Sequence, residues 1–294
     1  MTVFSTKLNT IANNTKSYLK SFFLKKKNNS YLLEPMKYGV FSGGKRFRSA
    51  IVVSTGKIYN IDYKKLIIVG SAIECIHSYS LIHDDLPSMD DDEMRRGKLS
   101  MHKKFNEFTA ILAGNSLLTL AFEILSEKDL KLDSKYKSEL IKTLSVSAGH
   151  SGLAGGQYFD LTFENKNISQ KDIINMQKKK TGELFGFCCE SIAIIKGVNS
   201  TKRKQLKKIG INIGLLFQTV DDLIDHKGDS SIVGKPTKSD KKKGKATLVN
   251  LLGYEETMNF AINLKKKIDQ QIKKYGNKAN DLSDSVEFIL KRKF

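Results

Sequence analysis

Apolar residues recur along most of this chain at the three- and four-residue spacing of an amphipathic helix. One such run extends from Leu66 to Ile82, and a second from Ile209 to Ile224. The sequence has no internal repeat, no low-complexity linker and no alternating strand pattern. Only 3 of its 294 residues are proline, which favours long uninterrupted helices. The pattern predicts an all-α protein, a single domain over residues 1–294 in which several helices surround a central cavity.

Two parts of the chain break this helical pattern. Gly152, Gly155 and Gly156 are expected to interrupt or bend the chain before Gln157. The stretch from Asp229 to Gly244 is polar and rich in lysine, and its composition is typical of a mobile loop.

Each of the two apolar runs ends in a cluster of aspartates, Asp84–Asp90 and Asp221–Asp225. Carboxylates gathered in this way repel one another unless a cation lies between them. Mg²⁺ prefers carboxylate oxygens and usually keeps waters or substrate phosphates as its other ligands. One acidic cluster is more often an acid-rich helix end, but two in equivalent places indicate a site for metal and diphosphate. The candidate metal ligands are Asp84, Asp85, Asp90, Asp221, Asp222 and Asp225.

Helical spacing predicts how these carboxylates are arranged. Asp221 and Asp225 are four residues apart and therefore share one helix face, with Gln218 one turn below. Pro87 breaks helical regularity, so a loop is expected to place Asp90.

Basic residues close to the acidic clusters are candidates for binding phosphate. Arg95 and Arg96 directly follow the first cluster, and arginine can grip phosphate in a bidentate fork. The turn Gly43–Arg48 combines flexible glycines with cations, which alone is a weak phosphate signature. His77 lies two turns before Asp84 on the same helix face, although a lone histidine on an apolar helix is more often a core residue. Three further lysines, each by itself most simply a solvated charge, are Lys180, Lys235 and Lys245.

The overall charge is strongly positive, with 50 Lys+Arg against 31 Asp+Glu and a formal charge of +19. Nucleic acid or an anionic membrane is one interpretation. The lysines are scattered without regular aromatic residues between them, so we interpret the charge as residue usage and expect no nucleic-acid partner. No segment reaches about 18 uncharged apolar residues, and no membrane insertion is expected.

Cysteine usage bears on the compartment. The three cysteines lack metal-ligand spacing and are too few for a disulfide framework, which favours a reducing, cytoplasmic location. The basic segment before Glu34 is interpreted as an ordinary first helix rather than a transit peptide.

At this point the chain resembles a known family, the short-chain trans-polyprenyl diphosphate synthases, and within it the bacterial-type farnesyl diphosphate synthases. The motifs occur in family order and span most of the chain. The GGKRxR turn, the arginine pair and the Lys-Thr-Gly triplet point to chain elongation, whereas the aspartate pair is also shared with class I terpene cyclases. The matching stretches are GGKRFR (43–48), ECIHSYSLIHDDLPSMDDDEMRRG (74–97), AGGQYFDL (154–161), KKTGELF (179–185), FQTVDDLID (217–225) and VGK (233–235).

The resemblance implies an all-α bundle with its active site in a central cavity, commonly a homodimer. It implies head-to-tail condensation of isopentenyl diphosphate with dimethylallyl or geranyl diphosphate to give mainly farnesyl diphosphate (C15). Mg²⁺ is the expected cofactor, as three ions once diphosphate is bound, and Mn²⁺ is possible. The alternatives are a geranyl or geranylgeranyl diphosphate synthase, a class I terpene cyclase and a non-catalytic subunit on the same fold.

The resemblance also assigns roles to residues. Catalysis is assigned to Lys180, Thr181, Gln218, Asp84 and Asp221. Isopentenyl diphosphate is expected to bind Lys45, Arg48, His77 and Arg96. The allylic diphosphate is expected to bind Arg95, Lys180, Thr181, Gln218, Lys235 and Lys245. The departing diphosphate would take the final proton, so no protein base is assigned.

Product length is predicted from the residues just before the first aspartates. Tyr79 and Ser80 lie five and four residues before Asp84, which is roughly 6 to 7.5 Å along a helix. A tyrosine ring there would close a tunnel after a few isoprene units, and the resemblance agrees with a C15 product. The alternative is that Tyr79 is simply a core aromatic residue.

The chain departs from the family pattern in three places. Ser49 stands where the family usually has proline. Lys238 and Ser239 replace a glycine-containing stretch, and Thr247-Leu248-Val249 replaces a more typical Thr-Tyr-Pro. These changes avoid the aspartates but leave the closure of the loop, and the role of Lys245, open.

Overall fold

The structure is a computed structural model that describes residues 3–26, 31–227 and 243–292. The predicted loop Asp229–Gly244 and the predicted site residue Lys235 therefore lie largely or wholly outside the described residues. The helices are α1 (Val3–Leu24), α2 (Leu33–Phe41), α3 (Phe47–Ile58), α4 (Tyr63–Asp84), α5 (Met101–Lys104), α6 (Glu107–Ser126), α7 (Ser134–Ala148), α8 (Leu153–Thr162), α9 (Gln170–Gln177), α10 (Glu183–Lys196), α11 (Ser200–Lys227), α14 (Leu248–Leu252), α15 (Tyr254–Lys273) and α16 (Asn280–Lys291). Short elements are the 3₁₀ turns η1 (Lys128–Leu130) and η3 (Gly276–Ala279), the π-helical turn η2 (Lys178–Gly182), and the strands β1 (Met94–Arg95) and β2 (Lys98–Leu99).

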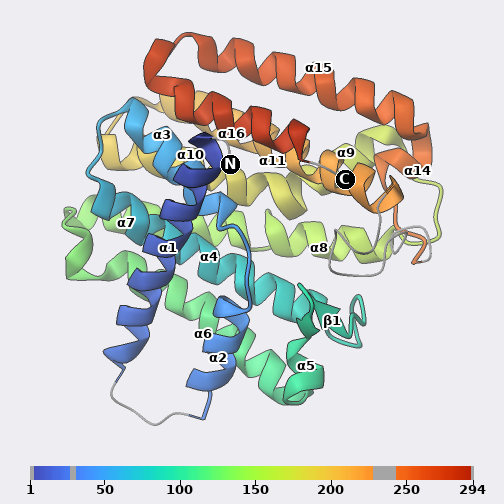
Figure 1. Cartoon of the computed structure of the whole chain (residues 1–294), viewed down its shortest axis with the longest axis horizontal. Coiled ribbons are helices and arrows are strands. Elements are labelled where there is room, and N and C mark those ends of the chain that lie inside the picture. The colour runs from blue at the N-terminus through green and yellow to red at the C-terminus, as the bar shows by residue number, and fades with distance from the viewer. Residues whose placement is uncertain (1–2, 27–30, 228–242, 293–294) are drawn as a thin grey trace.

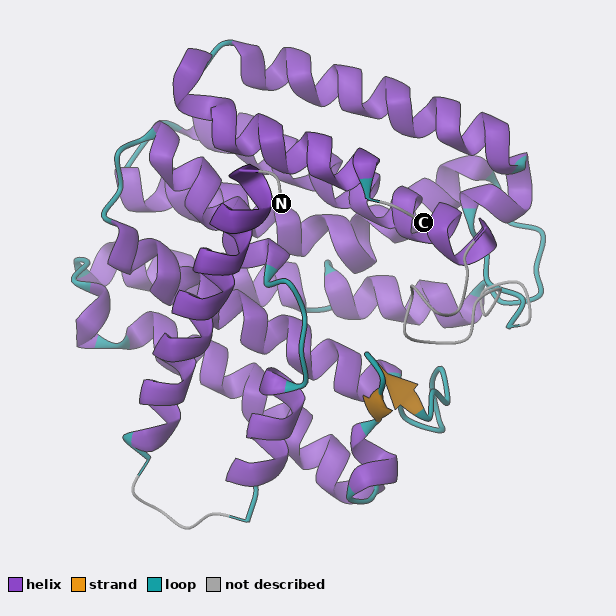
Figure 2. Cartoon of the chain, viewed as in Figure 1, coloured by secondary structure: helices purple, strands orange, loops and turns teal. Residues whose placement is uncertain are grey.

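The elements form a helical bundle with α15 and α16 along one edge and α2, α5 and α6 along the opposite edge (Figure 1). Figure 2 shows that helix dominates the described chain and that the strands are confined to one small hairpin. The predicted all-α fold is confirmed.

Helix α4 is the central element, as the apolar run ahead of the first acidic cluster predicts. Its start is capped by Asp62, whose side chain accepts a hydrogen bond from Lys65 N at 3.2 Å. Most of its residues are buried because α3 and α6 pack against it. The helix ends at Asp84, and the turn containing Pro87 carries the chain back so that Asp90 N donates to Asp84 O at 2.8 Å.

The predicted interruption before Gln157 is present at Gly152, between α7 and α8, but the prediction is wrong for the other two glycines. Gly155 and Gly156 lie inside α8, and only Gly152 precedes it. A Cβ atom added at Gly156 would lie 2.1 Å from the backbone nitrogen of Lys180. Glycine is therefore required because α8 and η2 approach each other too closely for a side chain.

The Lys-Thr-Gly triplet lies in η2, a π-helical turn between α9 and α10. Such turns widen a helix locally and often occur at functional sites. The triplet that the family resemblance singled out therefore lies in one wide helical turn.

The two strands are a feature that the hydrophobic pattern did not predict. Met94 pairs with Leu99 and Arg95 with Lys98 in an antiparallel hairpin. The two-residue turn between them has positive φ at both positions, 54° at Arg96 and 71° at Gly97, as tight hairpins require. Four strand residues are too few to show an alternating pattern in the sequence.

Two helices, α4 and α6, are long and apolar enough to cross a membrane by length and composition alone. In α4, 83% of the apolar window is buried inside the protein, whereas in α6 the figure is 44%. The composition of α4 thus serves the core of the bundle, and part of α6 leaves apolar side chains on the surface.

Candidate active site

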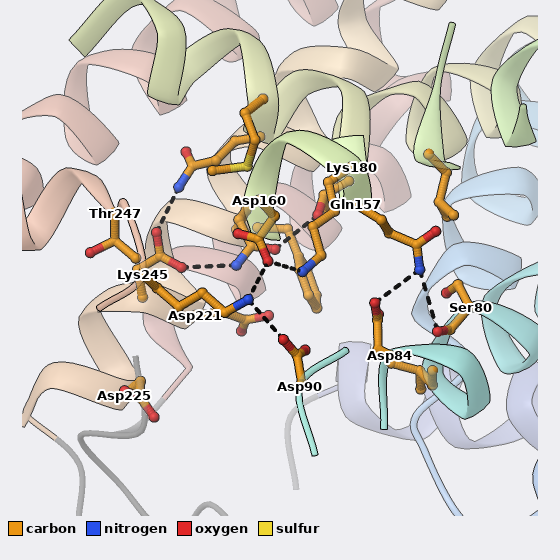
Figure 3. Close-up of a pocket in the computed structure, with 18 of the residues that line it drawn as sticks. Ser80, Asp84, Asp90, Gln157, Asp160, Lys180, Asp221, Asp225, Lys245 and Thr247 are labelled. Atoms are coloured by element: carbon orange, nitrogen blue, oxygen red, sulfur yellow. Dashed lines mark hydrogen bonds and ion pairs between the residues drawn. The ribbon is translucent and has the colours of Figure 1, made fainter. Parts of the chain in front are cut away.

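A cavity of about 410 Å³ lies among α4, α8, η2, α11 and the segment before α14 (Figure 3). Most of the residues that the sequence predicted for the site meet in it. The predicted residues that line it are Arg48, His77, Ser80, Asp84, Asp90, Arg95, Arg96, Lys180, Thr181, Gln218, Asp221, Asp222, Asp225 and Lys245. Residues that lie more than 100 positions apart in the chain are thereby brought into one pocket.

The first acidic cluster is held by donors from two sides. Gln157 on α8 donates from Nε2 to Asp84 Oδ1 at 2.9 Å, as Figure 3 shows. Burial raises the pKa of Asp84, so a positive partner is needed to keep it charged. Asp85 does not line the cavity: its Oδ1 accepts from Arg95 Nε at 2.9 Å, and burial raises its pKa to about 6. Asp85 therefore orients Arg95.

Asp160 joins two of the predicted lysines. Its Oδ2 accepts from Lys180 Nζ at 2.7 Å and from Lys245 Nζ at 2.9 Å. Lys245 also contacts Asp90 Oδ1 at 2.7 Å and Glu164 Oε1 at 2.8 Å, so it links the first cluster to α8 (Figure 3). Burial would raise the pKa of Asp160, but the two lysines hold it below its usual value.

The same carboxylates keep Lys180 charged. Burial alone would lower its pKa, but Asp160, Asp84 and Asp90 raise it above its usual value. The lysine is therefore a permanent cation at the wall of the cavity.

The second cluster forms a hydrogen-bonded network with the wide turn of η2. Asp222 accepts from Gln177 Nε2 at 2.6 Å and from Gln218 Nε2 at 2.8 Å. The amide oxygen of Gln218 in turn accepts from the Thr181 hydroxyl at 2.8 Å. These hydrogen bonds fix Thr181, Gln218 and Asp222 relative to one another. All three were predicted to belong to the same site.

Asp221 has a partner from the far end of the described chain. Arg292, which follows α16, donates from Nη1 to Asp221 Oδ1 at 2.8 Å and from Nη2 to Phe217 O at 3.1 Å. Its guanidinium also lies 4.0 Å from the centroid of the Phe217 ring.

A basic pocket lies beside the first cluster. Arg48 is buried and stacks 4.9 Å from the centroid of Phe185, and nothing in the described part of the chain accepts from its Nε. Burial, and then Arg48 and Arg96, lower the pKa of His77 well below its usual value, so the ring is neutral near pH 7. Burial and neighbouring arginines lower the pKa of Arg96 to about 10. An anion would relieve this concentration of positive charge.

Three of the predicted site residues that the structure describes lie outside the lining of the cavity. Lys45 is exposed, with Nζ 5.3 Å from the centroid of Phe288. Tyr79 is buried and packs edge-on against His83, with ring centroids 5.5 Å apart. Asp85 pairs with Arg95, and Lys235 is not described.

Sequence analysis gave no role to Gln157, Asp160, Gln177, Lys243 or Arg292. Gln157 and Asp160 are three residues apart in a matched motif, so a helix there places both on one face. This spacing could have identified both as candidate site residues. Lys243 contacts Asp90 O and Asp92 Oδ1, but in the sequence it is one of many scattered lysines.

The donor set fits Mg²⁺ by its chemistry. Seven aspartates line the cavity, five of them predicted metal ligands, and carboxylate oxygen is the ligand that this ion prefers. Within residues 3–26, 31–227 and 243–292, no three His, Cys, Asp or Glu side chains converge closely enough to hold a metal ion by themselves.

An all-helical bundle whose cavity carries two aspartate clusters beside a buried arginine pocket is the architecture of an isoprenoid synthase. The model of the polyprenyl synthetase family matches residues 29–287, and the chain belongs to this family. The predicted family and the prediction of a prenyltransferase enzyme are thus confirmed.

Known relatives agree with this assignment. The chain is 38% identical over 269 residues to the farnesyl diphosphate synthase of Escherichia coli, covering 90% of each. It is 42% identical over 226 residues to that of Micrococcus luteus, covering 77% of each. A solved geranyltransferase of Helicobacter pylori, complexed with magnesium and isoprenyl diphosphate, superposes with a TM-score of 0.84 at 32% identity, covering 99% of this chain and 97% of that one.

Proposed function

We propose that the chain condenses isopentenyl diphosphate head-to-tail with dimethylallyl or geranyl diphosphate, and that the main product is farnesyl diphosphate. The observation that carries this proposal is one cavity with two aspartate clusters on its walls and a separate basic pocket beside them. Two diphosphates need two such sites, whereas a terpene cyclase acts on a single diphosphate. The names of the relatives in E. coli and M. luteus support the C15 product.

The allylic diphosphate lies between the two aspartate clusters in this proposal. Bound Mg²⁺, as three ions with Mn²⁺ as a substitute, would neutralise the leaving diphosphate as a Lewis acid. Asp84 and Asp90 would hold the metal ions from one wall of the cavity. Asp221, Asp222 and Asp225 would hold them from the other wall. The protein cations Arg95, Lys180, Lys235 and Lys245 would bind the remaining phosphate oxygens.

The residues of η2 and α11 would stabilise the allylic cation that forms when the carbon–oxygen bond breaks. The proton of the Thr181 hydroxyl is engaged by Gln218, so the Thr181 oxygen offers a cation its lone pairs. The Gln218 amide oxygen and the Lys180 carbonyl add partial negative charge without acting as strong nucleophiles.

The basic pocket would hold isopentenyl diphosphate. Arg48 and Arg96 would bind its phosphates, neutral His77 would donate a hydrogen bond, and the exposed Lys45 would approach from the turn. After coupling, the departed diphosphate is the strongest base in the cavity and takes the proton. The lining of the cavity therefore needs no separate protein base.

The product would be limited by the residues below Asp84. Ser80 lines the cavity, and the buried ring of Tyr79 lies next to it on α4, packed against His83. A growing chain that passes Ser80 would meet aromatic side chains, which agrees with termination at C15.

A second copy of the chain is the proposed partner. Along α6, Phe108 is 66% exposed, Ile111 43% and Leu112 46%, which forms an apolar stripe on a helix that is otherwise built into the bundle. A homodimer through α6 would cover it. We place the enzyme in the cytoplasm without membrane insertion, and assign no nucleic-acid partner.

The deciding experiment incubates the purified protein with isopentenyl and dimethylallyl diphosphates and Mg²⁺, then sizes the prenyl alcohols after phosphatase treatment. Mainly C15 alcohol is expected. A second incubation contains dimethylallyl or geranyl diphosphate without isopentenyl diphosphate, and products formed there would instead identify a cyclase. No product in either incubation would identify a non-catalytic subunit. Predominant C10 or C20 alcohol would overturn the assigned product.

A further inference from the structure

Glu74 is a buried acid of α4 that has no place in the mechanism above. Its side chain is 2% exposed, and it lies one turn before His77 on the same helix. Its Oε1 accepts from the backbone nitrogen of Ser49 at 3.2 Å, and its Oε2 pairs with Arg46 Nη1 at 3.5 Å. Both partners belong to the turn and first residues of α3 that carry Arg48.

The contact with Ser49 caps α3 from another helix. The first amides of a helix have no acceptor within the helix, and a carboxylate there is favoured by the helix dipole. Ser49 keeps the backbone N–H that the cap needs, whereas a proline at this position would have none to donate. Glu74 therefore ties the start of α3 to α4 at the point where Arg48 enters the cavity.

The contact with Arg46 holds the preceding turn. Arg46 is 5% exposed and adopts a left-handed backbone conformation with φ of 51°, which is uncommon for a residue other than glycine. Its guanidinium also donates to Val40 O. The turn is thus fastened at its unusual residue by a buried ion pair with Glu74.

Charge balance gives Glu74 a second effect. Arg46, Arg48 and Arg96 gather around this part of α4, and Glu74 is the carboxylate that attracts all three. Without it, the buried guanidinium of Arg48 would face other cations with Asp221 as its remaining carboxylate countercharge, and its side chain would be driven from the position that binds phosphate.

We propose that Glu74 is a positioning residue for Arg48, and thereby sets the affinity of the basic pocket for the diphosphate of isopentenyl diphosphate. This inference rests on the proposed function of that pocket. The inference predicts an effect on the binding of isopentenyl diphosphate but not on that of the allylic diphosphate. The reason is that Glu74 supports the basic pocket and makes no contact with the aspartate clusters.

The test is Glu74→Gln, which keeps the size of the side chain and removes its charge. We expect the KM for isopentenyl diphosphate to rise about tenfold, the effect of losing one charge-assisted hydrogen bond. The KM for geranyl diphosphate and kcat should change less than about twofold, since binding alone is weakened. Calorimetric titration with isopentenyl diphosphate in the absence of Mg²⁺ should show the same loss of affinity.

The matched control is Glu190→Gln. Glu190 is also buried and also pairs with an arginine, Arg203, at 2.7 Å, but it lies on α10 away from the cavity lining. This variant should lose stability without a change in either KM. If both variants raise the KM for isopentenyl diphosphate equally, or if Glu74→Gln raises both KM values in parallel, Glu74 is merely structural.

Two further outcomes are distinguishable. Should Glu74→Gln fail to fold, Glu74→Asp carries the test, because it keeps the charge, and it should show a smaller rise in the KM for isopentenyl diphosphate alone. If the wild-type protein forms no product, the proposed function fails, but the calorimetric comparison still decides whether Glu74 sets the affinity of the pocket. Unchanged affinity in that titration overturns the inference.

Discussion

Arg292 lies against Asp221, with its Nη1 2.8 Å from Asp221 Oδ1, so a protein cation occupies one carboxylate of the second acidic cluster. The two residues are 71 positions apart in the chain. The Asp221 side chain is 40% exposed, which makes the pair accessible to solvent and to competing cations. Metal binding at Asp221 and the arginine contact are therefore expected to compete.

This competition gives the first prediction. Arg292→Gln should bind Mn²⁺ about two- to fivefold more tightly than the wild type in the absence of substrate, since partly exposed ion pairs contribute little. Electron paramagnetic resonance of the free ion measures this affinity. Lys291→Gln is the control, because Lys291 is exposed and pairs with Glu287 within α16. Equal affinities in both variants would contradict the competition.

Asp84 provides the second prediction, concerning catalysis. Asp84→Asn keeps the shape of the side chain and should lower kcat about 100- to 1000-fold, because a preorganised charge at the reacting diphosphate is lost. Steady-state kinetics at saturating Mg²⁺ measures the effect. Asp62→Asn makes the same change at the start of α4, where asparagine caps as well as aspartate, and should leave kcat unaltered. A kcat within tenfold of the wild type would remove Asp84 from the metal site.

Tyr79 tests the proposed limit on chain length. Tyr79→Ala opens space on α4 beside Ser80, so C20 and longer alcohols should accumulate at the expense of C15. Product sizing after phosphatase treatment measures the ratio. Tyr59→Ala removes a ring of the same size that packs against Tyr275, at a centroid distance of 6.3 Å, and should keep C15 as the main product. If Tyr79→Ala also makes only C15, its ring is a core aromatic residue and not the limit.

The apolar stripe of α6 gives a prediction about assembly. Leu112→Asp puts a charge into the proposed contact between two copies, and the variant should elute as a monomer. Light scattering coupled to gel filtration measures the mass. Leu251→Asp is the matched control, because Leu251 on α14 is 47% exposed and Leu112 is 46% exposed. A wild-type monomer, or dimers that persist in Leu112→Asp, would argue against this surface.

Asp281 ties three helices together and predicts how stability depends on pH. It pairs with Lys7 of α1 at 2.6 Å and also with Lys57 of α3. Burial raises its pKa, but the two lysines hold the pKa below the ordinary value of 3.8. An aspartate with a depressed folded-state pKa contributes stability above its ordinary pKa and loses it as the pH falls through the folded value.

The variant for this prediction is Asp281→Asn. Its free energy of unfolding should be about 1 kcal/mol lower than that of the wild type at pH 7. The difference should shrink below pH 3.8. Urea denaturation across this range measures it. Asp269→Asn, in a pair within α15, should have a smaller effect. A difference that stays constant down to acid pH would show that the charge of Asp281 is not the cause.

The helices and the two acidic clusters could be predicted because their signals are local. The spacing of apolar residues before Asp84 follows from the geometry of one helix, and the same holds before Asp225. Family motifs then indicated which charged residues share the site.

The partners of those residues could not be predicted from spacing. Gln157 meets Asp84 across 73 positions, and Glu74 reaches Ser49 across 25. Gly156 was expected to break the chain but lies inside α8. Glycine is needed there because the backbone of Lys180, from another segment, approaches too closely for a side chain.

By itself, therefore, the sequence determined which segments are helical and which of them carry carboxylates or cations, because periodicity along one segment decides this. Only the tertiary structure decided that Asp160 joins Lys180 to Lys245 and that Arg292 covers Asp221. Such pairings depend on how the buried faces of several helices pack against one another, and no single segment contains that information.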